Sequence, residues 1–222
     1  AREVELLEPA ENVFFKVYGN GILDGISNAA AGVVMDENGD LVVAGTAASI
    51  RDNVPVREIY VFKTDAHGFI REEVVLKDSF PMIARDIIKA AEGGYYVLGY
   101  RNETVDLRNV KIRLYLARLS EGLTVEWEQD TIDLLPSEME IPKSMTLNSQ
   151  GDLVIMGNYI DDQNDSSAFV ATFSQEGRLI REGSYRLDNG DISLSRNIVE
   201  GLFQSGMRYI MCFNESRTTL PS

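Results

Sequence analysis

Three polar stretches lie between apolar runs and carry most of the groups that could bind a ligand. They span residues 46–57, 100–111 and 158–167. Guanidinium, carboxylate and phenol groups can hydrogen-bond a sugar, a peptide or a protein surface, and loops on a rigid scaffold are where such groups concentrate. The candidate ligand-binding residues are Arg51, Arg101, Glu103, Arg108, Tyr159, Asp161 and Asp162. A polar loop that is merely solvated would have the same composition.

A basic residue recurs near the start of one apolar run in three parts of the chain. These residues are Arg85, Lys143 and Arg196, and Ala31 stands at the matching place in the first part. Positive charges on neighbouring inner strands would attract an anionic group. The alternative is that each base pairs with a nearby acid such as Asp86.

Residues suited to metal binding or nucleophilic catalysis are scarce. The acidic run 161–165 lacks the spacing and the final glutamate of a calcium loop. The chain has one histidine, His67, and one cysteine, Cys212, which removes most support for histidine zinc sites and for a Ser-His-Asp triad. Acidic neighbours such as Glu72 and Glu73 occur in any acidic chain and do not indicate a glycosidase. We therefore predict no catalytic residue, no metal and no cofactor.

The elements that must position these groups form a repeat. Glycines at the start of four apolar strands are separated by 54, 58 and 55 residues: Gly39, Gly93, Gly151 and Gly206. A second set, which follows another strand in each unit, is separated by 54 and 55 residues: Gly68, Gly122 and Gly177. Self-similarity at such a period indicates an array of supersecondary units.

Each unit holds four short strands, named a to d, with glycine turns between a and b and between c and d. No segment has the 3.6-residue period of a core helix. The predicted fold is all-β: a β-propeller of four-stranded antiparallel blades, about four of them, forming one region over 1–222. Its predicted parts are a lone strand d at 13–18, blades at 28–80, 81–139 and 140–190, and an incomplete fourth blade at 191–222.

The ends of this array would leave strand edges unpaired, and unpaired edges recruit other strands. We therefore expect either an open arc that belongs to a larger propeller or a two-fold homodimer in which two copies complete each other.

The charge of the chain limits its partners. It has 21 basic and 35 acidic residues, a net charge of −14, which repels phosphate backbones and anionic lipid heads. Nucleic acid is therefore not an expected partner. No apolar stretch is long enough for a transmembrane segment.

Several motifs are those of a known repeat. The runs Phe15-Lys16-Val17-Tyr18-Gly19, Gly93-Gly94-Tyr95-Tyr96-Val97-Leu98-Gly99 and Leu116-Ala117-Arg118-Leu119 resemble the repeat of secreted or lipid-anchored β-propeller proteins of Bacteroidetes bacteria, in which W-x-K-x-Y-G-G, D-G-G-Y-x-V-x-G and K-L-D-x-x-G follow one another. Cys212 stands where the repeat has its last glycine. The resemblance implies an exported protein, periplasmic or at the cell surface, and leaves open whether it is a lipoprotein.

These observations predict a non-enzymatic binding or scaffold module of an exported bacterial protein. It would engage a glycan, peptide or protein through the face formed by the b–c and d–a loops. The alternative is a carbohydrate-active hydrolase or lyase with carboxylates at the channel mouth. An enzyme would show two carboxylates converging in one pocket with raised pKa values, whereas a binding module would show a broad polar face.

The environment of Cys212 yields a test. The residue lies in the apolar run 209–213, so we predict a buried and unreactive thiol. A thiol reagent should modify the native protein slowly and the denatured protein fast. Rapid modification without denaturant would contradict this prediction.

Overall fold

The computed structural model describes residues 28–103, 111–132, 134, 139–160, 166–185, 196–205 and 208–216, with the backbone alone described for 130–132, 166, 185 and the last two ranges. Fourteen β-strands make up the secondary structure of this part of the chain. They are β1 (Ala29–Met35), β2 (Leu41–Arg51), β3 (Val54–Thr64), β4 (Ile70–Leu76), β5 (Met82–Lys89), β6 (Tyr95–Asn102), β7 (Ile112–Leu119), β8 (Val125–Ile132), β9 (Met139–Leu147), β10 (Leu153–Ile160), β11 (Ser166–Phe173), β12 (Leu179–Tyr185), β13 (Arg196–Ser205) and β14 (Arg208–Ser216).

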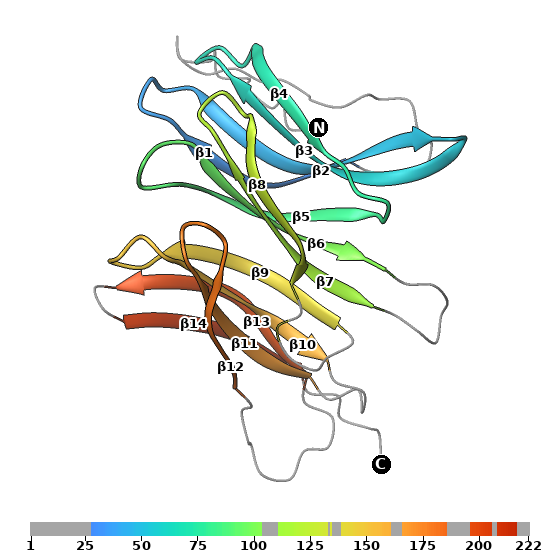
Figure 1. Ribbon diagram of the computed structural model, residues 1–222. Helices are drawn as coiled ribbons and strands as arrows, with labels where there is room; N and C mark the ends of the chain where they lie inside the picture. Colours follow the sequence, from blue (N-terminus) through green and yellow to red (C-terminus); the bar gives the residue numbers. More distant parts are fainter. Residues whose placement is uncertain are drawn as a thin grey trace, which may run out of the picture.

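Each group of four consecutive strands pairs antiparallel in chain order. We call β1–β4 unit 1, β5–β8 unit 2 and β9–β12 unit 3; β13 and β14 form a further hairpin. Units 2 and 3 are joined by a single parallel bridge between Ile112 and Met139. Figure 1 shows the units stacked one after another. The predicted all-β fold with antiparallel sheets is confirmed. The described strands do not close into a ring, and the blade limits stay a prediction.

The apolar core lies between neighbouring units. One buried cluster joins units 1 and 2 and includes Val42, Val61, Val97, Tyr115 and Ala117. A second cluster joins units 2 and 3 and includes Leu98, Leu116, Ile155, Phe169 and Ala171. Because successive side chains of a strand point to opposite faces, unit 2 sends Val97 to one neighbour and Leu98 to the other. Both faces of this sheet are thereby buried.

The a–b turns are five-residue turns with a glycine at the fourth position. Gly39, Gly93 and Gly151 have φ values of 83°, 89° and 84°, and each lies between the first and second strands of its unit. Their predicted placement in these turns is confirmed, while Gly206 lies outside the described residues. The β7–β8 turn differs, because Leu123, with φ of 55°, takes the left-handed position that the sequence had suggested for Gly122.

The first polar stretch is not a loop. The sequence predicted a polar loop over 46–57, but β2 and β3 pair down to Arg51 and Val54. Asp52 and Asn53 alone turn the chain, both with positive φ (51° and 64°), as in the type I′ turns that fit a twisted hairpin. Asp and Asn tolerate this conformation, so the hairpin extends instead of opening into a loop.

A β-bulge lies at the same place in every a–b hairpin. It explains why a glycine recurs on the second strand of units 1 to 3, at Gly45, Gly99 and Gly157. The register skips Ala31, Arg85, Lys143 and Glu200. A Cβ at the facing glycine would meet a bulge-strand carbonyl, at 2.6 Å for Gly45 and 2.3 Å for Gly157. In the fourth hairpin Cys212 pairs with Gly201, beyond the bulge. In units 1 to 3 the glycine pairs with the residue just before the bulge, and in the fourth hairpin Phe213 does so. The sequence alignment of Cys212 with these glycines is therefore wrong by one residue.

The bulge generates a matched pair of glycine substitutions. Gly157→Ala would press a Cβ onto Ile141 O and the Phe169 ring at 2.3 and 2.7 Å, whereas a Cβ at Gly39 meets nothing within 4 Å. We expect Gly39→Ala to cost about 1–2 kcal/mol of left-handed strain and Gly157→Ala about 3 kcal/mol or more from overpacking. Urea unfolding measures both, and equal losses would contradict the proposed role of the bulge.

Candidate functional site

Three of the predicted ligand-binding residues converge at the b–c end of units 1 and 2. Asp78, in the β4–β5 connection, holds them together: its backbone carbonyl accepts a hydrogen bond from Arg51 Nη1 at 2.5 Å. Its carboxylate accepts another from Arg101 Nη1 at 3.0 Å. Arg101 Nη2 donates in turn to Glu103. We call Arg51, Glu58, Asp78, Arg101, Glu103 and Lys111 the loop-end cluster.

The carboxylates of the loop-end cluster are paired with cations. Arg51 Nη2 lies 2.6 Å from Glu58 Oε1, and Lys111 Nζ lies 3.9 Å from Glu103 Oε2. The Arg51 and Lys111 side chains are 37% and 45% exposed, against 7% for Glu58 and 15% for Glu103. The cluster thus turns positive groups outward and keeps its acids beneath them.

The Asp78 carboxyl is held in its ionised form. Burial by itself would raise its pKa, but hydrogen bonds from Phe80 N, the Arg101 guanidinium and the Ser79 hydroxyl bring the pKa below its ordinary value. Such a carboxyl is a poor general acid near neutral pH. The sequence analysis missed Asp78, because nothing in its local sequence distinguishes it from other acids in turns.

A second buried ion pair lies where units 2 and 3 meet. Glu140 is fully buried, and its carboxylate accepts hydrogen bonds from Leu134 N at 2.9 Å and Leu114 N at 3.5 Å. Arg113 Nη1 lies 3.7 Å from Glu140 Oε1. The pair satisfies backbone donors next to the bridge between β7 and β9, so its role is to join the two units.

Asp86 joins unit 2 to unit 3 in a similar way. Its carboxylate accepts hydrogen bonds from Met145 N at 2.9 Å and from the Ser144 hydroxyl at 3.2 Å, as well as from Ile87 N at 2.9 Å. Burial raises the pKa of Asp86, although these hydrogen bonds act in the opposite direction. The side chain is therefore engaged with β9 and does not pair with Arg85.

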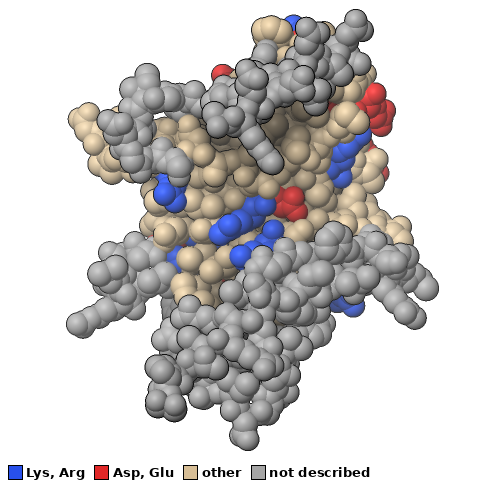
Figure 2. Space-filling view, turned by 180° about the vertical axis from the view of Figure 1, so that it is seen from behind, with Lys and Arg blue, Asp and Glu red and all other residues tan. Residues whose placement is uncertain are grey.

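The predicted row of bases is shorter than the sequence suggested. Arg85 and Lys143 occupy equivalent bulge positions on β5 and β9, and both are partly exposed. Arg196 pairs with Ser216 at the far end of its hairpin, four residues before the bulge residue Glu200. Figure 2 shows lysine and arginine side chains gathered near the middle of one face of the molecule.

Arg85 also contacts an aromatic ring. Its guanidinium carbon lies 4.9 Å from the centre of the Tyr100 ring, and Nη2 lies 3.4 Å from the Tyr100 hydroxyl. The contact holds the arginine against unit 2 through a cation–π interaction.

The remaining predicted residues divide into two groups. Tyr159 is partly buried and packs against the core cluster between units 2 and 3, and its role in binding stays a prediction. Arg108, Asp161 and Asp162 lie outside the described residues, as does the lone strand at 13–18. The Cys212 side chain is likewise not described, and its burial stays a prediction.

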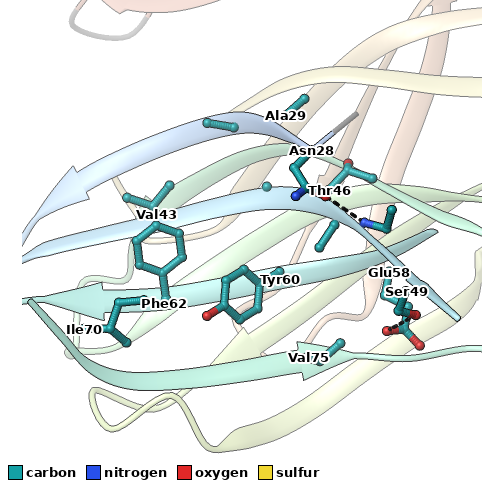
Figure 3. A pocket seen from close by; sticks show the side chains of 14 residues that line it. Asn28, Ala29, Val43, Thr46, Ser49, Glu58, Tyr60, Phe62, Ile70 and Val75 are labelled. Atoms are coloured by element: carbon teal, nitrogen blue, oxygen red, sulfur yellow. Dashed lines mark hydrogen bonds between the residues drawn. The ribbon is translucent and has the colours of Figure 1, made fainter. Parts of the chain in front are cut away.

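The first unit carries a cleft that the sequence analysis did not find. It has a volume of about 540 Å³ and lies on one face of the sheet formed by β1 to β4. Figure 3 shows Val43, Tyr60 and Phe62 directed into it, and the Tyr60 and Phe62 ring centres are 5.4 Å apart. Asn28 and Glu58 add polar groups to its wall. We call it the unit 1 cleft.

The polar groups of the unit 1 cleft have partners. Asn28 Oδ1 accepts a hydrogen bond from Ala48 N at 2.9 Å, and Glu58 accepts one from the Ser49 hydroxyl at 2.9 Å (Figure 3). The Tyr60 hydroxyl donates to Glu73. Burial, together with this carboxylate, raises the pKa of Tyr60 to about 12. The tyrosine therefore stays protonated and neutral at physiological pH, and the cleft is mainly apolar.

Within the described ranges, no group of three or more His, Cys, Asp or Glu side chains could hold a metal ion. Among the same residues, no helix is long and apolar enough to cross a membrane.

No protein-family model matches the chain, and no curated protein matches it. The chain is similar to a solved structure, a protein of unknown function from Bacteroides caccae, with 14% sequence identity and a TM-score of 0.44. The likeness covers 79% of this chain and 52% of the other, so the chain spans about half the length of that protein.

The loop-end cluster generates a pH-dependent prediction. Because folding lowers the pKa of Asp78, its charge stabilises the fold above the unfolded pKa, and this stabilisation is lost as pH falls through the folded pKa. Asp78→Asn should lower the free energy of unfolding by about 1–3 kcal/mol at pH 7. The difference from wild type should begin to shrink below about pH 4 and should be lost as pH falls through the lowered folded pKa, where the native carboxyl is protonated as well.

Urea unfolding at several pH values measures this difference. Glu37→Gln, in the exposed β1–β2 turn, is the control and should leave stability nearly unchanged. A loss for Asp78→Asn that is the same at pH 3 as at pH 7 would show that the charge of Asp78 does not stabilise the fold.

Proposed function

We propose that this chain is a β-propeller binding or scaffold module of an exported bacterial protein, and that it engages a glycan, peptide or protein through its b–c and d–a loop face. The proposal of a propeller, about four blades of which are present, is supported by the repeated four-stranded units. Their first strands β1, β5, β9 and β13 contact one another in series. In a propeller the innermost strands of successive blades do so.

The observation that carries the binding function is the arrangement of charge in the loop-end cluster. Its carboxylates lie beneath more exposed cationic groups, so this end offers hydrogen-bond donors to a ligand. Arg51 and Lys111 suit acceptor oxygens, such as those of an acidic sugar or of a peptide carboxylate. The predicted binding residues Arg101 and Glu103 support this rim from below.

A carbohydrate-active hydrolase or lyase is the alternative. Such an enzyme needs a general acid with a raised pKa close to a second carboxylate. In the loop-end cluster the pKa of Asp78 is lowered and the acids are paired with cations. The raised pKa of Asp86 belongs to a carboxyl bonded to the backbone of β9. These contacts favour binding over hydrolysis.

The proposed cellular location rests on the resemblance of the chain to exported propeller repeats. We propose a periplasmic or cell-surface protein, and lipid anchoring stays part of that proposal. A net charge of −14 opposes binding to nucleic acid and anionic lipid.

The experiment screens the protein against a microarray of plant, host and microbial glycans and against a phage-displayed peptide library. For a ligand that binds, the double variant Arg51→Ser/Lys111→Ser should weaken binding about tenfold or more, since two charge-assisted hydrogen bonds are lost. Arg71→Ser is the control, because Arg71 follows the β3–β4 turn at the opposite end of the unit and is 63% exposed. Equal weakening by the control, or no binding to either library, would refute the proposal. Release of shortened glycan would instead support the enzyme.

A further inference from the structure

An exposed aromatic ring lies beside the loop-end cluster. Phe80, in the β4–β5 connection, is 38% exposed, and its backbone N–H donates a hydrogen bond to the Asp78 carboxylate at 3.0 Å. The Arg101 guanidinium carbon lies 5.4 Å from the centre of the Phe80 ring, so the two groups form a cation–π contact. The ring is therefore part of the same surface as the cationic groups, and a ligand can reach it.

The backbone around Phe80 is bonded on both sides, which fixes the place of the ring. On one side Asp78 is tied to both flanking units, because its carbonyl accepts from Arg51 and its carboxylate accepts from Arg101. On the other side Asn102 N donates to Pro81 O at 2.9 Å. A ring that is already held in place loses little further freedom when a ligand packs against it.

The exposed charges of the loop-end cluster are positive. The Arg51 and Lys111 side chains are 37% and 45% exposed. The side chains of the acids Glu58, Asp78 and Glu103 are 7%, 10% and 15% exposed. A ligand at this surface would therefore meet N–H donors and an apolar ring, and few free acceptors.

This combination suits an acidic sugar. The face of an aromatic ring carries partial negative charge, and the C–H groups on one side of a pyranose ring carry partial positive charge, so the two rings can stack. A uronic acid adds a carboxylate, which accepts charge-assisted hydrogen bonds from guanidinium and ammonium groups. An extended peptide fits less well, because its backbone N–H groups need acceptors and the acids of the cluster lie beneath its cations.

We propose that the loop-end cluster binds an acidic saccharide, in which a uronic acid ring stacks on Phe80 and carboxylates of the saccharide pair with Arg51 and Lys111. This inference rests on the proposed binding function and narrows its ligand to an anionic glycan. In this arrangement Phe80 selects a sugar ring, and the two cations select its charge.

The experiment is isothermal titration calorimetry with trigalacturonate, trimannuronate, triguluronate and a hyaluronan tetrasaccharide. At least one of these should bind, and its carboxyl-reduced counterpart should bind about tenfold more weakly, since charge-assisted hydrogen bonds are lost. Phe80→Leu keeps an apolar side chain but removes the flat ring, and it should weaken binding of the acidic probe about tenfold. Phe80→Tyr keeps the ring and should bind as wild type does. Phe69→Leu is the matched control and should change nothing, because Phe69 is also an exposed phenylalanine, at 61%, but lies between β3 and β4 at the opposite end of unit 1.

Circular dichroism and urea unfolding establish that each variant is folded, and the comparison of acidic and carboxyl-reduced probes needs no variant. Equal affinity for the two probes would overturn the proposal. So would a Phe80→Leu variant that binds as tightly as wild type, or an equal loss in Phe69→Leu. Binding of a peptide or a neutral glycan, with no binding of any uronic acid probe, would overturn this inference and leave the proposed binding function intact. Absence of binding to every probe and to both libraries would overturn both.

Discussion

The structure depends on the burial of sheet faces between consecutive units. A sheet face that is lined by apolar side chains is stabilised when another layer covers it. Unit 2 meets this requirement with unit 1 on one face and unit 3 on the other. Val97 and Leu98 point to opposite faces of unit 2, so that each face packs against a different neighbouring unit. This alternation allows the units to stack in a single row.

Polar contacts between units fix how the layers align. Ala84 N donates to the Thr46 hydroxyl at 3.0 Å, and Met145 N donates to Asp86 at 2.9 Å. In both cases a side chain of the preceding unit accepts from the backbone of the next first strand, which would otherwise leave a buried donor unsatisfied. Tyr96 and Trp127 of unit 2 reach the β11–β12 turn of unit 3, where Tyr96 Oη donates to Gln175 O at 3.3 Å. These hydrogen bonds are directional, so they fix how one unit is aligned on the next, which apolar packing alone does not determine.

The same layering produces two surfaces of different chemistry, which share Glu58. The loop-end cluster lies at the strand ends, where connections between units bring charged side chains together. The unit 1 cleft lies on a sheet face, where the repeat brings apolar side chains together. A ligand at the first surface would be recognised by charge and hydrogen bonds, whereas the second surface is mainly apolar. The two surfaces can therefore be tested by different substitutions.

The sequence by itself determined the strands, their antiparallel order and the glycine turns, because these follow from local properties. Strand faces alternate with a period of two, and a left-handed turn position selects glycine. Tertiary structure alone decided which charges meet. Arg51 and Asp78 are 27 residues apart and come together only because units 1 and 2 pack, and Asp86 bonds to Met145 in the next unit for the same reason. The bulge could not be predicted from the sequence either, because a bulge is defined by the pairing with a facing strand. For this reason the sequence aligned Arg196 with Arg85, although Glu200 is the bulge residue equivalent to Arg85. The cleft on unit 1 was not predicted either, because whether a sheet face is covered depends on the neighbouring element and not on the residues of that face.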